Sequence, residues 1–194
     1  MKTITVEEDL RIITRLLGEQ CIIAIFQGRA ESGPRALGNR SIIWDPQIPV
    51  GRVRVNKLKN REWWRPFAGV IDEEAAPYWF DMKGMKSSPF MSYAVKLRDP
   101  GHGGMISSIL HNDDTCRIQT VSPEQNPTLS KIIRAYNLDG GSTIPPILGN
   151  TSFNRAGEPL IHTIDDAIKA LKSDDFIEYL YLPEEGKLLF SPNA

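Results

Sequence analysis

The sequence has no hydrophobic run long enough to cross a membrane, and it contains very little cysteine. Its longest apolar stretches, such as Cys21–Phe26, fall far short of the roughly 20 residues that a membrane-spanning helix needs. Cys21 and Cys116 lie far apart without metal-ligand spacing, which argues against a disulfide framework and favours a reducing compartment. The N-terminal MKTITVEEDL is too acidic for a signal peptide, so we expect a cytoplasmic protein with no membrane partner.

The motifs of several common enzyme classes are also missing. No GxxxxGK[ST] phosphate-binding loop occurs, and no GxGxxG follows a predicted strand. His102, His111 and His162 lack zinc spacing, so we expect them in loops and predict no metal site within the chain. Ser152 has no evident histidine or aspartate partner for a hydrolase triad. These absences argue against a P-loop nucleotidase, a zinc enzyme and a serine hydrolase.

What the sequence does hold is a concentration of positive charge, in a chain whose formal net charge is −1. Nine basic and three acidic residues lie between Arg29 and Arg65, a local charge of +6, which leaves about −7 for the rest of the chain. A compact basic segment in an otherwise acidic protein indicates a local anion site more than a surface for a long polyanion. Nucleic acid is therefore a disfavoured partner.

Hydrophobic periodicity predicts a mixed α/β (α+β) domain. We expect helices over residues 5–18 with Thr5 as N-cap, from Asp72, over 126–141, and over 162–174 with Thr163 as N-cap. Strands are predicted at residues 21–26, 41–45, 90–97, 115–121, 176–182 and 186–191, and residues 50–62 fit either a strand or a helix. The 194 residues suffice for one sizeable core and no linker divides them, so residues 1–194 are expected to form a single domain.

Two basic segments are candidates for the anion site. FQGRAESGPRALGNRS follows a predicted strand and carries Arg35 and Arg40, whose planar guanidinium groups can each hold two oxygens of a phosphate or carboxylate. NKLKNREWWRP repeats the pattern with Lys59, Arg61 and Arg65. Several converging cations suit a substrate with more than one anionic group. The alternative is that these side chains form surface ion pairs or hold loops through backbone carbonyls.

A third segment, GNTSFN, is expected to form a loop after an apolar strand. Asn150, Ser152 and Asn154 can donate to and accept from a carbonyl, a phosphate or a ribose, although such residues also form ordinary turns. Arg117 and Gln119 share one face of a predicted strand and can face the same cleft. Trp63 and Trp64 invite the hypothesis of base stacking, but we expect one of them in the core.

Four segments together resemble the C-terminal domain of the NodU/CmcH family of O-carbamoyltransferases. They run in order from about residue 20 to residue 182: QGRAESGPRALGNRSIIWDP, NKLKNREWWRPFA, HNDDTCRIQTV and GNTSFNRAGEPLIHTIDDAIKAL. The resemblance implies a YrdC-like fold, a twisted mixed sheet with flanking helices around a basic concavity. It also implies that the domain uses ATP with Mg²⁺ and carbamoyl phosphate to form a carbamoyl-adenylate. A separate actin-like domain, with a metal in its own motif, then transfers the carbamoyl group to an acceptor hydroxyl.

The same resemblance suggests roles for individual residues. Lys59 and Arg65 match the family's nucleotide- and carbamoyl-phosphate-binding cations, and with Arg35 they form the predicted catalytic set. The predicted binding residues are Arg40, Arg61, Arg117, Asn150, Ser152 and Asn154, of which Arg61 and Asn150 rest on their side-chain chemistry alone.

This sequence departs from the family pattern in two ways. The family usually has His-Val-Asp-Gly-Thr where this chain has HNDDT, so Asp114 replaces a glycine and we expect an altered turn before Arg117. The N-terminal transfer domain has no counterpart here, which implies a separate partner subunit or a fragment that is inert alone. A function of another class, a non-catalytic nucleotide- or RNA-binding subunit on the same fold, is the alternative.

Overall fold

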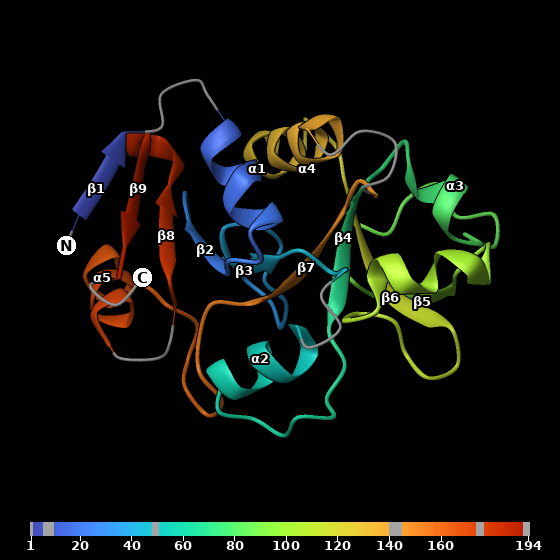
Figure 1. The fold of residues 1–194 in the computed structure, drawn as a ribbon, viewed down its shortest axis with the longest axis horizontal. Helices are drawn as coiled ribbons and strands as arrows, with labels where there is room; N and C mark the ends of the chain where they lie inside the picture. Colours follow the sequence, from blue (N-terminus) through green and yellow to red (C-terminus); the bar gives the residue numbers. More distant parts are fainter. Residues whose placement is uncertain (1, 6–9, 48–50, 140–144, 174–176, 192–194) are drawn as a thin grey trace.

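The computed structural model has a single mixed β-sheet at its centre (Figure 1). It describes residues 2–5, 10–47, 51–139, 145–173 and 177–191. Within these residues nine strands pair in the order β1-β9-β8-β2-β3-β7-β4-β6-β5. β2 runs parallel to β8 and β4 to β6, and the other neighbouring pairs are antiparallel. The strands are β1 (Lys2–Thr5), β2 (Ile23–Phe26), β3 (Arg40–Trp44), β4 (Ala68–Asp72), β5 (Tyr93–Lys96), β6 (Thr115–Val121), β7 (Ile147–Ser152), β8 (Tyr179–Leu182) and β9 (Lys187–Phe190).

Helices pack on both faces of the sheet and divide the apolar interior into two cores. One core joins α1 and α4 to the sheet, and the other joins it to α2, α3 and α5. Ile42 and Ile43 are neighbours in β3 but lie in different cores, because successive strand residues point to opposite faces. The helices are α1 (Arg11–Gly18), α2 (Gly51–Leu58), α3 (Ala76–Trp79), α4 (Pro127–Asp139) and α5 (Ile164–Lys172), with 3₁₀ turns at Pro100–Ile106 and Pro183–Glu185. No helix in these described segments is both long and apolar enough to span a bilayer.

The two helices with the clearest capping signals are confirmed. α4 begins at Pro127, and the Asn126 side chain accepts a hydrogen bond from the backbone N–H of Leu129 at 3.0 Å. Thr163 caps α5 by accepting from the N–H of Asp166, while the Asp166 carboxylate accepts from the N–H of Thr163 at 3.1 Å. Residues 140–141, the predicted end of this helix, lie outside the described residues. Capping chemistry therefore located the start of these two helices correctly.

The predicted helix over residues 5–18 is wrong at its start. Thr5 ends β1, which pairs antiparallel with β9, and α1 begins only at Arg11. Residues 6–9 lie outside the described part of the chain. β1 exists because of a strand at the opposite end of the sequence, and hydrophobic periodicity around Thr5 carries no sign of that partner.

Two more predictions are corrected along the middle of the sheet. Asp72 does not begin a helix; it ends β4, a strand buried along its whole length, and its carboxylate pairs with Arg134 at 2.6 Å. Gly149–Ser152 of the predicted GNTSFN loop belong to β7, between β3 and β4. Polar residues in a central strand are unusual, because both faces of such a strand are normally apolar. The ambiguous segment 50–62 contains α2.

The turn before β6 holds Asp114 in a backbone conformation that favours glycine. Asp114 takes a φ of +60°, in the left-handed region, and its N–H donates to the carbonyl of His111 at 3.1 Å. The N–H of His111 donates in turn to the carbonyl of Thr115 at 2.8 Å. The expected difference from the family's turn stays a prediction, and the pairing of β6 with β4 places Arg117 opposite Ala68.

The Asp114→Gly variant should be more stable by about 0.5–1 kcal/mol. Glycine has no β-carbon, so it removes the strain of the left-handed backbone conformation, and this gain exceeds the entropy that the more flexible glycine loses on folding. Chemical denaturation measures the change. Asp113→Ala is the control in the same turn, because the Asp113 carboxylate accepts from the N–H of Thr115 at 3.1 Å and its loss should destabilise the turn. A destabilised Asp114→Gly protein would contradict the described backbone.

Close packing explains one glycine of β7. A β-carbon placed on Gly149 would lie 2.2 Å from the ring of Trp44, a fully buried side chain that also donates a hydrogen bond to Ser108. The tryptophan ring therefore lies directly on the backbone of β7. This contact fixes the strand that carries Asn150 and Ser152 into the candidate site.

Gly149→Ala should lower the free energy of unfolding by about 2–3 kcal/mol, because the buried tryptophan has no space to retreat into. The midpoint and slope of urea denaturation, followed by tryptophan fluorescence, measure this loss. Gly33→Ala is the matched control: a β-carbon there would meet nothing within 4 Å, so stability should stay within about 0.5 kcal/mol. Equal behaviour of the two variants would disprove the packing argument.

Candidate functional site

Four arginines from three separate segments converge at one end of the sheet. Arg35 lies in the loop after β2, Arg61 and Arg65 follow α2, and Arg117 is in β6. Burial, followed by the charges of Arg65 and Arg117, lowers the pKa of Arg61 to about 10. The pKa of Arg117 is lowered by its burial and by the charge of Arg35. Charges act strongly on each other only over short distances, so the structure groups these four predicted residues, which we call the arginine cluster.

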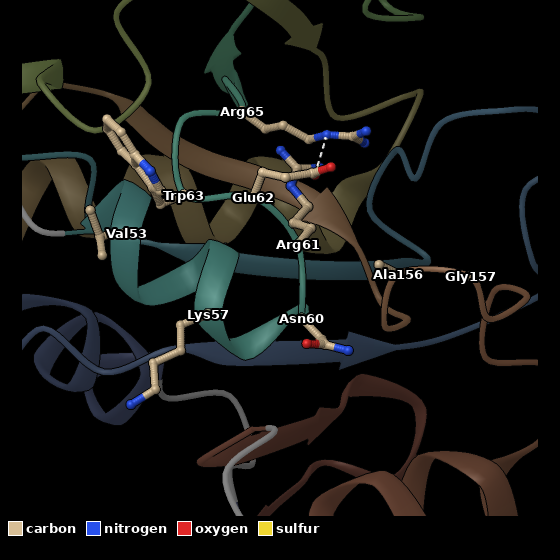
Figure 2. A pocket seen from close by; sticks show the side chains of 9 residues that line it. All are labelled: Val53, Lys57, Asn60, Arg61, Glu62, Trp63, Arg65, Ala156 and Gly157. Carbon is tan, nitrogen blue, oxygen red and sulfur yellow. Dashed lines mark ion pairs between the residues drawn. The ribbon is translucent and has the colours of Figure 1, made fainter.

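The arginine cluster holds little compensating negative charge. Arg65 pairs with Glu62 at 2.8 Å, the carboxylate drawn with it in Figure 2. Arg61 donates instead to neutral groups, the side chain of Asn56 and the carbonyl of Pro66, and stacks over the ring of Phe67. Four cations with one paired acid leave an excess positive charge that an anionic ligand would neutralise.

Buried polar atoms without partners mark the same place. Arg117 Nε and Asn150 Oδ1 are buried, and neither has a hydrogen-bond partner among the described residues. Both residues are register partners of Ala68, one in β6 and the other in β7. Directly paired residues point to the same face of a sheet, so the short side chain of Ala68 lies between an unsatisfied donor and an unsatisfied acceptor. An unmade buried hydrogen bond costs about 1–3 kcal/mol, and a bound ligand is one way to recover it.

His111, which we expected to have only a loop role, borders this group. Its Nε2 is another buried atom without a partner in the described segments, and its Nδ1 lies 3.0 Å from the hydroxyl of Thr115. Burial lowers the pKa of His111, and the charge of Arg117 adds to the effect. Both effects favour the neutral form of the His111 imidazole, which lies close enough to Arg117 to be affected by its charge.

Lys59, Ser152 and Asn154 form a second group, also drawn from the predicted set. The ammonium of Lys59 donates to the carbonyl and hydroxyl of Ser152, and to the carbonyl and side-chain oxygen of Asn154 at 2.7 and 3.0 Å. Lys59 is only 3% exposed, and burial lowers its pKa to about 7, helped by the charge of Arg61. The lysine thus ties the end of α2 to the end of β7.

The structure gives Arg40 a different environment from the other predicted cations. It is buried, and it donates to the carbonyls of Gln27, Gly28, Asn39 and Ile161 at 2.6–3.1 Å. Its guanidinium also lies 3.6 Å from the centre of the Phe26 ring. Nearly all of its donors are therefore engaged by the protein itself, which is the loop-holding alternative considered for these arginines.

A hollow of about 870 Å³ opens beside the arginine cluster (Figure 2). Trp63 lies on its rim and is 68% exposed, and Trp64 is 58% exposed. The expectation that one of these tryptophans is a core residue is wrong; Trp44 is the buried one. The hollow is lined by Val53, Lys57, Asn60, Arg61, Glu62, Trp63, Arg65, Ala156 and Gly157.

Sequence reasoning missed Glu31 and Ala68, and it gave Gln119 a possible cleft role without defining its contacts. Ala68 carries no chemistry of its own and matters only through the register of β4. Glu31 accepts backbone N–H groups from its own loop, and no local motif signals this. Among the described residues, no group of three or more His, Cys, Asp or Glu side chains is placed to hold a metal ion.

Comparison with known families decides what kind of domain this is. The family described as Carbamoyltransferase C-terminus matches residues 14–185, nearly the whole chain. The chain belongs to this family. The carbamoyltransferase domain is 42% identical over 156 residues to nodulation protein NolO of Bradyrhizobium diazoefficiens, covering 79% of this chain and 28% of that protein. It is 33% identical over 149 residues to the 3′-hydroxymethylcephem-O-carbamoyltransferase of Amycolatopsis lactamdurans, covering 76% and 27%.

Solved structures confirm the predicted fold class. Full-length HypF in a phosphate- and nucleotide-bound form superposes with a TM-score of 0.61 at 16% identity, over 89% of this chain and 24% of HypF. HypF of T. kodakarensis gives a TM-score of 0.60, also at 16% identity, over 96% and 22%. These likenesses concern the fold. The carbamoyltransferase domain spans about a quarter of the length of the relatives it matches.

Arg117→Met should raise the free energy of unfolding by about 0.5–1 kcal/mol. Methionine keeps much of the side-chain length while removing a partly buried cation that has an unpaired buried donor and a repulsive neighbour. Thermal and urea denaturation without ligand measure the change. Arg40→Met is the contrast, expected to lose about 2–3 kcal/mol because backbone carbonyls lose their donor. A large loss of stability in Arg117→Met would show that Arg117 supports the fold.

Proposed function

We propose that this domain activates a carbamoyl group by binding ATP and carbamoyl phosphate and forming carbamoyl-adenylate. The observation that carries the proposal is the partly buried Arg117, with an unpaired donor, inside a cluster of four arginines with one paired acid. Such a cluster suits a ligand with several phosphate groups, because each charge that the protein leaves uncompensated can be compensated by the ligand. Membership of the carbamoyltransferase family supports the carbamoyl part of the proposal.

The chemistry requires charge stabilisation more than a protein nucleophile. Hydrolysis of carbamoyl phosphate by water gives carbamate and inorganic phosphate. A carbamate oxygen then attacks the α-phosphorus of ATP. The bond from the α-phosphorus to the oxygen that bridges to the β-phosphate breaks, and pyrophosphate leaves. Negative charge develops on the phosphoryl oxygens during this exchange. Fixed guanidinium groups of Arg61, Arg65 and Arg117 stabilise that charge without having to reorient.

The residues near the arginine cluster indicate how Mg²⁺ and the carbamoyl group would be held. The described residues offer no carboxylate cage for Mg²⁺, so the ion would arrive with the nucleotide and be held largely by its phosphates. Bound there, it would neutralise phosphate charge. The Nε2 of His111 and the Oδ1 of Asn150 have no partner among the described residues, so both are available to hydrogen-bond a carbamoyl amide. Lys59 keeps Ser152 and Asn154 in place beside them.

We further propose that transfer to an acceptor hydroxyl takes place on a separate domain or subunit. The carbamoyltransferase domain spans 28% of NolO and 27% of the cephem O-carbamoyltransferase, so most of each relative lies outside the matched part. An acyl-adenylate reacts readily with water, which favours direct passage to a partner domain over release.

A non-catalytic RNA- or nucleotide-binding role is the second candidate. It is favoured by one observation, the exposed Trp63 and Trp64 beside Arg61 and Arg65, because basic residues interleaved with aromatic ones can bind single-stranded nucleic acid. The small extent of this surface and the net charge of −1 weigh against it. Steep salt dependence of RNA binding, without carbamoyl-phosphate-dependent turnover of ATP, would favour this candidate.

The chain incubated with ATP, Mg²⁺ and carbamoyl phosphate should release pyrophosphate and form an adenylate that mass spectrometry detects. Arg117→Gln should lower the rate of pyrophosphate release by about 10²–10³-fold, the usual cost of removing one preorganised charge-stabilising group. Arg15→Gln is the control, because Arg15 is an exposed residue of α1 that pairs with Glu19.

The control variant should keep the wild-type rate within about twofold. An Arg117→Gln protein with the full rate of carbamoyl-phosphate-dependent pyrophosphate release would refute the proposed site. Pyrophosphate release that does not depend on carbamoyl phosphate would instead refute the carbamoyl chemistry, while leaving nucleotide binding in place.

A further inference from the structure

Residues 31–39 belong to the loop between β2 and β3. Side chains bind most of the backbone N–H and carbonyl groups at the end of this segment, residues 36–39. Glu31 accepts hydrogen bonds through one carboxylate oxygen from the N–H groups of Leu37 and Asn39, at 2.6 and 2.8 Å. The hydroxyl of Ser41 accepts from the N–H of Gly38 at 2.9 Å. The N–H groups of three consecutive residues in an irregular segment are thereby satisfied by side chains and not by backbone carbonyls.

The carbonyls of the same stretch are held from the sheet. The amide of Asn150 in β7 donates to the carbonyl of Ala36 at 3.3 Å, and the amide of Gln119 in β6 donates to that of Leu37 at 2.9 Å. Gln27, which follows β2, donates to the carbonyl of Gly38 at 2.9 Å. Three neighbouring carbonyls are thus each bound by an amide side chain from a different part of the sheet.

These amide side chains are also joined to one another and to α4. Asn150 donates to Gln119 at 2.8 Å, and Gln27 donates to Asn126 at 3.2 Å. Asn126 caps α4 and packs so closely on the loop that a β-carbon on Gly38 would lie 2.5 Å from its amide. Gly38 has a φ of +119°, so glycine suits both the backbone and the space. The loop therefore rests on a continuous polar layer that fixes its path.

Arg35 lies at the exposed part of this pinned loop. Its guanidinium donates to the carbonyl of the preceding Pro34 at 3.1 Å, and its positive charge lowers the pKa of Arg117 in β6. A flexible loop would have to be ordered each time Arg35 engaged an anion, which weakens binding, whereas a pinned loop has already lost that freedom during folding.

We propose that Glu31 and Gln119 are positioning residues, which hold loop 31–39 so that Arg35 faces the anion bound by Arg117. Gln119 is not left free to contact that anion itself: its amide donates to Leu37 and its oxygen accepts from Asn150. Glu31, being negative, would repel the ligand in direct contact and can help only through the loop. This inference deepens the proposed function and rests on its anion site, but not on the carbamoyl chemistry.

A double-mutant cycle between Glu31 and Arg35 tests the proposal. Binding of inorganic pyrophosphate, a simple polyanion, is measured by calorimetry, so the test does not depend on turnover. Glu31→Ala should weaken binding about 10- to 30-fold, and Glu31→Gln, which keeps an acceptor oxygen for both N–H groups, less than about threefold. In an Arg35→Ala background, Glu31→Ala should cost less than a further twofold, because its effect passes through Arg35. Gln119→Ala should weaken binding in the same direction and lose its effect in that background.

Hydrogen exchange of the free protein gives an independent readout. The amides of Leu37 and Asn39 should be protected in the wild type and in Glu31→Gln, and should exchange at least tenfold faster in Glu31→Ala. Glu185→Ala, which removes an exposed carboxylate that pairs with Lys187, is the control and should change neither exchange nor binding.

The outcomes separate the two proposals. Pyrophosphate binding with the expected coupling, but no carbamoyl-phosphate-dependent turnover, would uphold the positioning role and refute the proposed reaction. Three results would overturn the positioning role: full additivity of Glu31→Ala and Arg35→Ala, unprotected Leu37 and Asn39 amides in the wild type, or no pyrophosphate binding by the wild type. If Glu31→Ala fails to fold, the Gln119→Ala cycle with Arg35→Ala and the wild-type exchange still decide.

Discussion

The arrangement of the site depends on one electrostatic constraint: positive charge is gathered where the protein supplies too little negative charge to balance it. Burial and the charges of neighbouring arginines lower the pKa values of Arg61 and Arg117, and Glu62 is the acid that pairs with Arg65. Like charges held together cost free energy, and burial increases the cost because the local dielectric is low. The rest of the fold must supply that energy, which it does through two apolar cores on the two faces of the sheet.

The register of the sheet places the unsatisfied polar groups of the site next to each other, where one ligand can reach both. β4 lies between β6 and β7, and Ala68 in β4 is paired with Arg117 on one side and Asn150 on the other. A larger residue in place of Ala68 would fill the space between these two unsatisfied polar groups. Trp44 fixes β7 from the opposite direction by packing on Gly149. Small residues in the central strands thus determine where the polar side chains are held.

From the sequence, it was easier to predict which residues gather at the site than what each of them does there. Composition alone indicated an anion site near Arg35, Arg61 and Arg65, because charge imbalance can be counted without knowing the fold. Arg40 belongs to the same segment, yet it binds backbone carbonyls, and nothing in the residue type distinguishes it from Arg35. β1 and β4 form by pairing with strands that are far away in the sequence. The hydrogen bond from Gln119 to the loop also joins residues that are distant in the sequence. Periodicity reports local structure, so it could not reveal them.

Lys59 and Arg117 show why two cations of one site can differ in kind. Lys59 is surrounded by oxygens of Ser152 and Asn154, so the protein already offers it what a phosphate would offer. Arg117 is partly buried, and its buried Nε has no partner among the described residues. A ligand that approached Lys59 would have to replace existing hydrogen bonds, whereas one that approached Arg117 would satisfy a missing one. The gain in free energy on binding is therefore expected mainly at Arg117, and Lys59 contributes chiefly by fixing the strand end on which the ligand rests.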